Sequence, residues 1–140
     1  MAFVGKKFPN LSVNAMNEMG DTFKINILEE AQKNNKKVLL FWYPKDFTFV
    51  CPTELHAFQD ALADFEKRNT MVIGASCDTA EVHFAWLNTP KDNGGIEGVT
   101  YPLVADSNRN LSAVLDILDA TEQQYDENSG VVLLEGDNVT

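Results

Sequence analysis

The stretch "KVLLFWYPKDFTFVCPTE", residues 37–54, decides the fold class of this chain. Its first seven residues form a nearly continuous apolar run, which is typical of a β-strand buried on both faces. Pro44 ends that run, and Pro52 stands where the first turn of a helix tolerates a missing N–H group. The stretch is therefore predicted to be a buried strand, a loop and the start of a helix.

The residues that follow complete a strand–helix–strand unit. From Pro52 to Asn69 the apolar side chains recur every three or four positions and predict one stripe of a helix: Leu55, Phe58, Leu62 and Phe65. The next segment, "MVIGAS" (71–76), predicts a second buried strand. Such units are right-handed, so strands 38–43 and 71–77 are expected to be parallel.

The rest of the chain adds elements around this unit. Two alternating segments, "LSVNA" (11–15) and "TFKIN" (22–26), flank a Gly20-Asp21 turn and predict a hairpin, followed by a short polar helix or loop. The further expected elements are helices at 79–88 and 108–118, a segment returning to the sheet edge at 101–106 and a short strand at 131–134. The apolar face of the last helix is expected to hold Leu111, Val114, Leu115 and Leu118. The prediction is one α/β domain, residues 1–140, with an unfinished C-terminal edge.

Composition and charge exclude several classes of protein. A chain of 140 residues forms one domain, and a net charge of −10 argues against nucleic-acid binding. The longest apolar run is too short to span a bilayer, and no apolar run follows the two N-terminal lysines as in a signal peptide. Two cysteines make no disulfide framework. We expect a cytoplasmic protein without a membrane partner.

Cys51 is the candidate nucleophile. It follows the carboxyl end of a predicted parallel strand, where open α/β sheets place their chemistry, and the N–H groups of a helix start stabilise a thiolate. The hydroxyl of Thr48 can cap the turn or reach the sulfur or a substrate oxygen, and Pro44 can shield the sulfur from water. The alternative is a small buried cysteine at a helix start. Its position and these neighbours favour the nucleophile.

The residues around Cys51 also carry a family resemblance. "FWYPKDFTFVCPTE" (41–54) resembles the peroxidatic-cysteine signature of the typical two-cysteine peroxiredoxins, of the alkyl hydroperoxide reductase C type. Further segments match in order: "VIGASCD" (72–78), "HFAWLNTPK" (83–91), "YPLVAD" (101–106) and "NRNLS" (108–112). The resemblance runs from about Phe8 to Leu118. It implies a thioredoxin-like fold, a central mixed sheet flanked by helices.

The resemblance implies a thiol-dependent peroxidase for hydrogen peroxide and organic hydroperoxides, with a role in antioxidant defence and redox homeostasis. Cys51 would become a sulfenic acid, Thr48 would hydrogen-bond the peroxide and Pro44 would wall off the sulfur. Glu54 matches a glutamate that helps to hold the arginines of the site. No metal or organic cofactor is expected. The implied electron donor is thioredoxin or a dedicated flavoprotein disulfide reductase, and the implied assembly is a homodimer or a ring of dimers.

Two features of the family pattern are missing from these residues. One is the active-site arginine, because Arg109 matches a different position that is more consistent with a structural or surface role. The other is the resolving cysteine, because Cys77 ends a predicted buried strand and is expected to be a core residue. We expect a chain truncated at its C-terminus. The alternative function is a non-catalytic thioredoxin-fold interaction or oligomerisation module in which Cys51 is unused.

Other residues give weaker signals. His56 and His83 lie on predicted helices without metal-ligand spacing, so they are expected to be packed or surface residues. The segment from Asp106 resembles a calcium loop only at its start. Trp42 and Trp86 are expected to be core or interface aromatics, and the resemblance adds a role in assembly for Phe47, Phe84 and Trp86.

Overall fold

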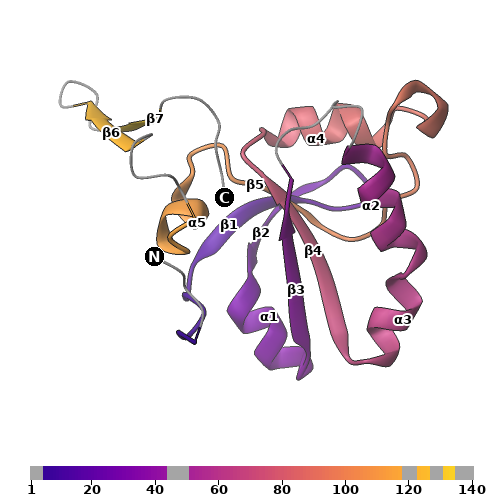
Figure 1. Ribbon diagram of the computed structural model, residues 1–140, viewed down its shortest axis with the longest axis horizontal. Helices are drawn as coiled ribbons and strands as arrows, with labels where there is room; N and C mark the ends of the chain where they lie inside the picture. Colours follow the sequence, from indigo (N-terminus) through magenta and orange to yellow (C-terminus); the bar gives the residue numbers. More distant parts are fainter. Residues whose placement is uncertain (1–4, 44–50, 118–122, 127–130, 135–140) are drawn as a thin grey trace.

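The computed structural model of the chain describes residues 5–43, 51–117, 123–126 and 131–134, apart from the side chains of Cys51 and of the last two segments. The described residues form a five-stranded mixed sheet with helices on both faces (Figure 1). The strand order is β2-β1-β5-β4-β3. The predicted α/β architecture, a mixed sheet flanked by helices, is confirmed.

The strand–helix–strand unit forms as predicted, with one difference. β3 (Lys37–Trp42) and β4 (Thr70–Ser76) are parallel. The connection is not one helix but two, α2 (Cys51–Asp60) and α3 (Leu62–Lys67). At the break, the carbonyl of Ala61 accepts from the backbone N–H groups of both Asp64 and Phe65, which tightens the chain there. The apolar stripe survives the break, because all four of its side chains pack into one cluster: Leu55, Phe58, Leu62 and Phe65.

The predicted hairpin is confirmed as β1 (Ser12–Met16) and β2 (Thr22–Asn26), which pair antiparallel. In the turn, the Oδ1 atom of Asn17 accepts from the backbone N–H groups of Met19 and Asp21. Gly20 has a φ of +82°, and a Cβ atom there would lie 2.6 Å from the ring of Phe84. Glycine therefore meets both the backbone conformation and the packing of this turn.

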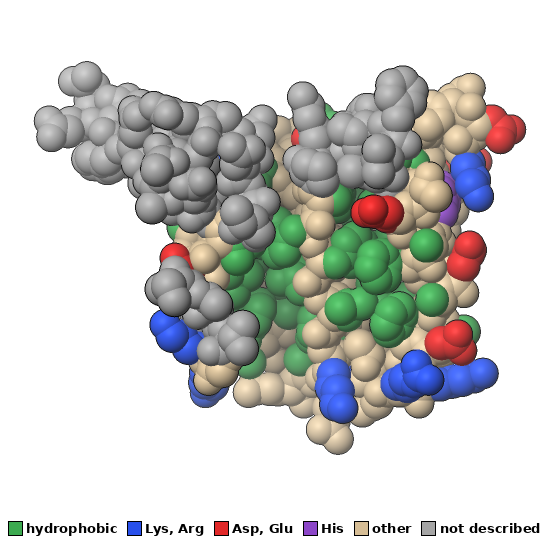
Figure 2. Space-filling view, in the orientation of Figure 1, with side chains coloured by type: hydrophobic (Ala, Val, Ile, Leu, Met, Phe, Trp, Pro, Cys, Tyr) green, Lys and Arg blue, Asp and Glu red, His purple; other side chains and the backbone are tan. Residues whose placement is uncertain are grey.

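The order of the strands corrects two expectations. β5 (Leu103–Ala105) lies between β1 and β4 instead of at the edge, and its three apolar side chains are buried. β3 is one of the two edge strands of the described sheet, and its side chains are mostly half-buried instead of buried on both faces. Figure 2 shows hydrophobic side chains at the surface over the region of β3. An apolar run indicates a strand between two layers of helices, but it does not indicate whether the strand has one neighbour or two.

The helices divide the core into two clusters, one on each face of the sheet. On one face, α2, α3 and α4 (Ala80–Leu87) cover a cluster that includes Leu55 and Trp86. On the other, α1 (Ile27–Asn34) and α5 (Asn110–Val114) cover a second cluster (Figure 1). The residues of β3 alternate between the two clusters. Cys51, at the start of α2, therefore belongs to the face that α4 also covers.

The C-terminal part differs in detail from the prediction. α5, predicted to span 108–118, is shorter than expected. Of the side chains predicted for its apolar face, Leu111 and Leu115 are buried, but Val114 is 44% exposed. Leu118 lies outside the described residues. The expected strand at 131–134 is present as β7 (Val131–Leu134), and it pairs antiparallel with β6 (Gln123–Asp126), which has no counterpart in the prediction. A short 3₁₀ helix, η1 (Lys91–Asn93), follows α4.

Within the described ranges, no helix combines the length and the hydrophobicity needed to cross a membrane.

Candidate active site

Cys51 is the first residue of α2, as its sequence position predicts. β3 ends at Trp42, and the backbone N–H of Tyr43 extends the parallel ladder by donating to the carbonyl of Ala75 at 3.0 Å. Cys51 thus begins the helix that comes next after a parallel strand among the described elements. The first N–H groups of a helix have no partner within the helix, and they favour an anion at this point. Pro44 and Thr48, predicted to assist Cys51, lie outside the described residues.

The first turn of α2 has an inner and an outer side. Pro52 and Leu55 are buried, whereas Glu54 is exposed in the first turn. An acidic side chain in this position stabilises the helix through its dipole. Arg68 follows α3 and Arg109 lies at the start of α5, under the opposite face of the sheet. A role of Glu54 in holding active-site arginines therefore remains a prediction.

Tyr43, the residue that follows β3, is anchored by α4. Its hydroxyl lies 3.4 Å from Nδ1 of His83, and Nε2 of His83 lies 3.0 Å from the carbonyl oxygen of Val104. A carbonyl oxygen only accepts, so Nε2 carries the hydrogen, and in the neutral ring Nδ1 accepts from Tyr43. Both side chains are buried. His83 is therefore a packed histidine, as expected, that fixes the end of β3 beside α4.

A second set of contacts ties α2 to the segment before β5. The Oε1 atom of Gln59 accepts from the backbone N–H of Thr100 at 2.9 Å. The hydroxyl of Tyr101 donates to the carbonyl of Leu55 at 2.8 Å. Nε2 of His56 lies 3.1 Å from the carbonyl oxygen of Gly95. Burial raises the pKa of Tyr101 well above its usual value, so this hydroxyl keeps its proton and remains a donor. The helix that begins at Cys51 is thereby held along its length.

Cys77 is only partly buried, which corrects the expectation of a core residue. It comes directly after the end of β4, and its Sγ atom lies 3.9 Å from the hydroxyl oxygen of Ser112 in α5. α5 covers the face of the sheet opposite to α2. The expectation that Cys77 is not a resolving cysteine remains a prediction. Arg109 also belongs to this side, where it adopts a φ of +59° and its Nη1 atom donates to the carbonyl of Ser107 at 3.4 Å.

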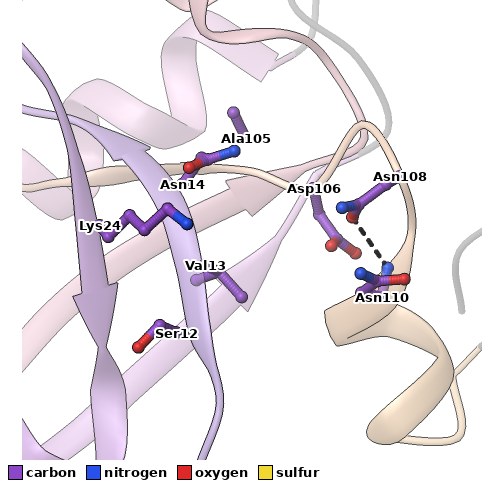
Figure 3. Close-up of a pocket in the computed structure, with 8 residues that line it drawn as sticks. All are labelled: Ser12, Val13, Asn14, Lys24, Ala105, Asp106, Asn108 and Asn110. Carbon is purple, nitrogen blue, oxygen red and sulfur yellow. Dashed lines mark hydrogen bonds between the residues drawn. The ribbon is translucent and has the colours of Figure 1, made fainter.

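A polar cavity of about 190 Å³ lies beside α5 (Figure 3). Figure 3 shows side chains of β1 and β2, among them Lys24, on one side, and Asp106, Asn108 and Asn110 on the other. The carboxylate of Asp106 is already engaged, because it accepts from the backbone N–H groups of Leu111 and Ser112 and from the hydroxyl of Ser112. This carboxylate therefore holds the start of α5.

Sequence patterns give no signal for the roles of Tyr43, Gln59 and Tyr101. Tyr43 and Tyr101 are aromatic residues next to strands, where a purely apolar role is the usual one. Gln59 is a polar residue of a helix, where solvent exposure is the usual state. Their partners lie about forty or more positions away in the chain.

Across the described ranges, His, Cys, Asp and Glu side chains form no group of three or more that could hold a metal ion.

Comparisons with known proteins point to one family. The model of the AhpC/TSA family matches residues 4–133. Alkyl hydroperoxide reductase C of Helicobacter pylori is 46% identical over 102 residues, which are 73% of this chain and 50% of the relative. Peroxiredoxin-2 of Bos taurus is 43% identical over 121 residues, which are 86% of this chain and 59% of the relative.

A solved structure shares the fold. The reduced 2-Cys peroxiredoxin of Plasmodium vivax has a TM-score of 0.78 and 31% sequence identity, over 99% of this chain and 89% of that chain. The thioredoxin-like fold that the resemblance implies is confirmed by this likeness. The chain spans between 50% and 63% of the length of the first curated relatives that it matches.

Proposed function

Because the chain belongs to the AhpC/TSA family, we propose that it provides the nucleophile of a thiol-dependent peroxidase that reduces hydrogen peroxide and organic hydroperoxides. One observation carries the proposal: Cys51 is the first residue of α2, the helix that follows β3 in the sequence. The first N–H groups of a helix have no partner within the helix, and they stabilise the ionised form of a thiol on its first residue.

The proposed reaction begins with the Cys51 thiolate. The sulfur attacks the terminal oxygen of the hydroperoxide, an S–O bond forms and the O–O bond breaks. The sulfur is oxidised by two electrons to a sulfenic acid, and the departing alkoxide or hydroxide takes up a proton to leave as alcohol or water. A dithiol reductant then returns two electrons, in two exchange steps that release water from the sulfenic acid and restore the thiol.

The remaining roles are part of the proposal. Thr48 donates a hydrogen bond to the peroxide, Pro44 keeps water from the sulfur, and Glu54 orients arginines that approach the site. The electron donor is thioredoxin or a dedicated flavoprotein disulfide reductase. The working form is a homodimer or a ring of dimers in the cytoplasm, where thiols are kept reduced.

The test compares two single substitutions in the same protein. Cys51→Ser is expected to abolish rapid peroxide consumption in stopped-flow assays, because serine is a far weaker nucleophile at neutral pH. Cys77→Ser, the matched control, is expected to retain it, since Cys77 lies against α5 on the opposite face of the sheet. Unchanged consumption in the Cys51→Ser protein would refute the proposed nucleophile.

The intact mass of the protein after one equivalent of hydrogen peroxide separates the enzyme from a non-catalytic module. The proposal predicts a prompt gain of one oxygen that depends on Cys51 and reacts with a reagent specific for sulfenic acids. An unchanged mass at this dose would instead identify a thioredoxin-fold interaction module.

A further inference from the structure

We propose that Gln59, Tyr101 and His56 are positioning residues that act on Cys51 through α2. Their contacts with Gly95, Thr100 and Leu55 are called the α2 clamp below. The inference rests on the proposed role of Cys51 as the nucleophile. In this view the clamp holds the first turn of α2 in the position that stabilises the thiolate.

The exposed part of the clamp joins Gln59 to Thr100. The Oε1 atom of Gln59 accepts from the backbone N–H of Thr100 at 2.9 Å and lies 3.2 Å from its Oγ1 atom. The Nε2 atom of Gln59 lies 3.1 Å from the same Oγ1 atom. One carboxamide group therefore contacts both the backbone and the side chain of a single residue. This arrangement fixes the end of α2 in two directions.

The buried part of the clamp is the hydroxyl of Tyr101. It donates to the carbonyl of Leu55, one helical turn after Cys51, and both Tyr101 and Leu55 are buried. The ring of Tyr101 also meets the ring of Phe41 edge to face, with centroids 5.7 Å apart. The tyrosine thus connects the middle of α2 to β3, the strand from which the chain leaves toward Cys51.

The segment that receives these contacts is itself anchored. Nε1 of Trp86 donates to the carbonyl of Gly94 at 2.9 Å, which joins the segment to α4. The backbone N–H of Gly74 in β4 donates to the carbonyl of Pro102 at 3.0 Å. Nε2 of His56 then adds its contact to the carbonyl of Gly95. The clamp therefore connects α2 to α4 and β4.

The influence of the clamp on the cysteine follows from helix physics. An isolated helix as short as the ten residues of α2 is marginally stable in water, so tertiary contacts determine how well its first turn is formed. The favourable effect of a helix N-terminus on an anion falls off within one turn. Loss of the contacts at Leu55 and Gln59 is expected to leave the first turn of α2 less well formed. A less well formed first turn stabilises the thiolate less, so the equilibrium at Cys51 shifts from thiolate toward thiol.

The experiment measures the reaction of Cys51 with iodoacetamide as a function of pH. The Cys77→Ser background leaves Cys51 as the remaining cysteine of the chain. Gln59→Ala and Tyr101→Phe are each expected to raise the midpoint of the pH profile by roughly 0.3–0.7, the size expected for a helix terminus. Hydrogen exchange of the amides of residues 51–60 is expected to be faster in both variants.

Two variants serve as matched controls. Gln32→Ala makes the same substitution at an exposed position of α1, and Thr100→Ser keeps the hydroxyl and the backbone N–H that contact Gln59. Both are expected to leave the midpoint unchanged. Gln59 is partly exposed, so its alanine variant is expected to remain folded even if Tyr101→Phe lowers stability more strongly.

The outcome that overturns the inference is an unchanged midpoint in folded Gln59→Ala and Tyr101→Phe proteins, even with a lower melting temperature. That result would show that the clamp contributes to stability but does not affect the ionisation of Cys51. The readout uses an alkylating agent and no peroxide. A shifted midpoint in a protein that never forms a sulfenic acid would therefore support the clamp while refuting the peroxidase.

Discussion

Tyr101 shows how one buried hydroxyl links stability to pH. Its side chain is only 4% exposed, and its hydroxyl donates to the Leu55 carbonyl. Ionisation would place a charge in the apolar cluster and remove the donor, so burial raises the pKa above the unfolded value of 10.0. The folded protein therefore keeps a proton that the unfolded chain loses. The stability from this group is fully present below pH 10 and decreases as the pH rises further.

Tyr101→Phe tests this linkage. Above pH 10 the wild-type free energy of unfolding is expected to fall by up to about 1.4 kcal/mol per pH unit more than that of the variant. At pH 8 the variant is expected to be less stable by about 1 kcal/mol, because it lacks the hydrogen bond. Urea unfolding between pH 8 and 11 measures both effects. Parallel curves over the whole range would contradict the burial of an ionisable hydroxyl at this position.

His83 illustrates a second residue whose function is set by its surroundings. Its ring bridges the hydroxyl of Tyr43 and the carbonyl of Val104, and both ring nitrogens are used in the neutral state. The ring also lies against Tyr43, with centroids 6.3 Å apart. A histidine in a helix can bind metals or transfer protons, but this geometry gives it a structural role at the end of β3.

At the scale of secondary-structure elements, α5 depends on a residue that lies outside it. A helix of five residues does not form by itself, and its first N–H groups need acceptors. Arg109, at the N-cap, makes no side-chain cap bond. The carboxylate of Asp106 instead accepts from the backbone N–H groups of Leu111 and Ser112, at 3.0 and 2.9 Å. The carboxylate therefore completes the helix from the end of β5.

Asp106→Asn is expected to lower the free energy of unfolding by about 1.5–3 kcal/mol, the range for hydrogen bonds to a charged group. Asparagine replaces one acceptor oxygen with an NH₂ donor. That donor would face groups that themselves donate to Asp106, namely the backbone N–H groups of Leu111 and Ser112 and the hydroxyl of Ser112. Asp92→Asn makes the same substitution at an exposed position of η1 and is expected to stay within about 0.5 kcal/mol of wild type. Chemical unfolding of the two variants measures the difference. Equal stabilities would show that the carboxylate does not hold α5.

At the scale of the whole molecule, the surface carries an apolar region on α4. Phe84 is 47% exposed, and nearby Met19 in the β1–β2 turn is 79% exposed. Phe84 borders a cavity of about 290 Å³, which is lined by Met16, Gly20, Thr22, Ala80 and Glu81. Large exposed apolar side chains that gather around a hollow are typical of protein interfaces. This surface is a candidate contact for the proposed assembly of several copies.

Phe84→Glu is expected to shift the protein toward smaller species in size-exclusion chromatography with light scattering. Loss of one buried phenylalanine from an interface corresponds to at least about tenfold weaker association. Val114→Glu is the control, because Val114 is 44% exposed on α5, over the opposite face of the sheet. Identical masses for wild type and Phe84→Glu would exclude this surface from the assembly.

The local elements of the fold and the place of Cys51 at the start of a helix were predictable from sequence. The alternation of β1 and β2, the apolar runs of β3 and β4 and the helical stripe from Leu55 all follow from periodicity along the chain. Cys51 at the start of a helix follows from the same local signals. The apolar stripe did not indicate the break at Ala61, where one expected helix proved to be two.

The sequence by itself therefore determined the α/β class, the parallel strand–helix–strand unit and the place of Cys51 at the start of a helix. Only the tertiary structure decided that β5 is central, that β3 is an edge strand and that α2 is clamped by Gln59 and Tyr101. The physical reason is distance along the chain. Periodicity reports which side of an element is apolar, whereas strand order and hydrogen bonds such as those across 41 and 46 positions arise when the whole core packs.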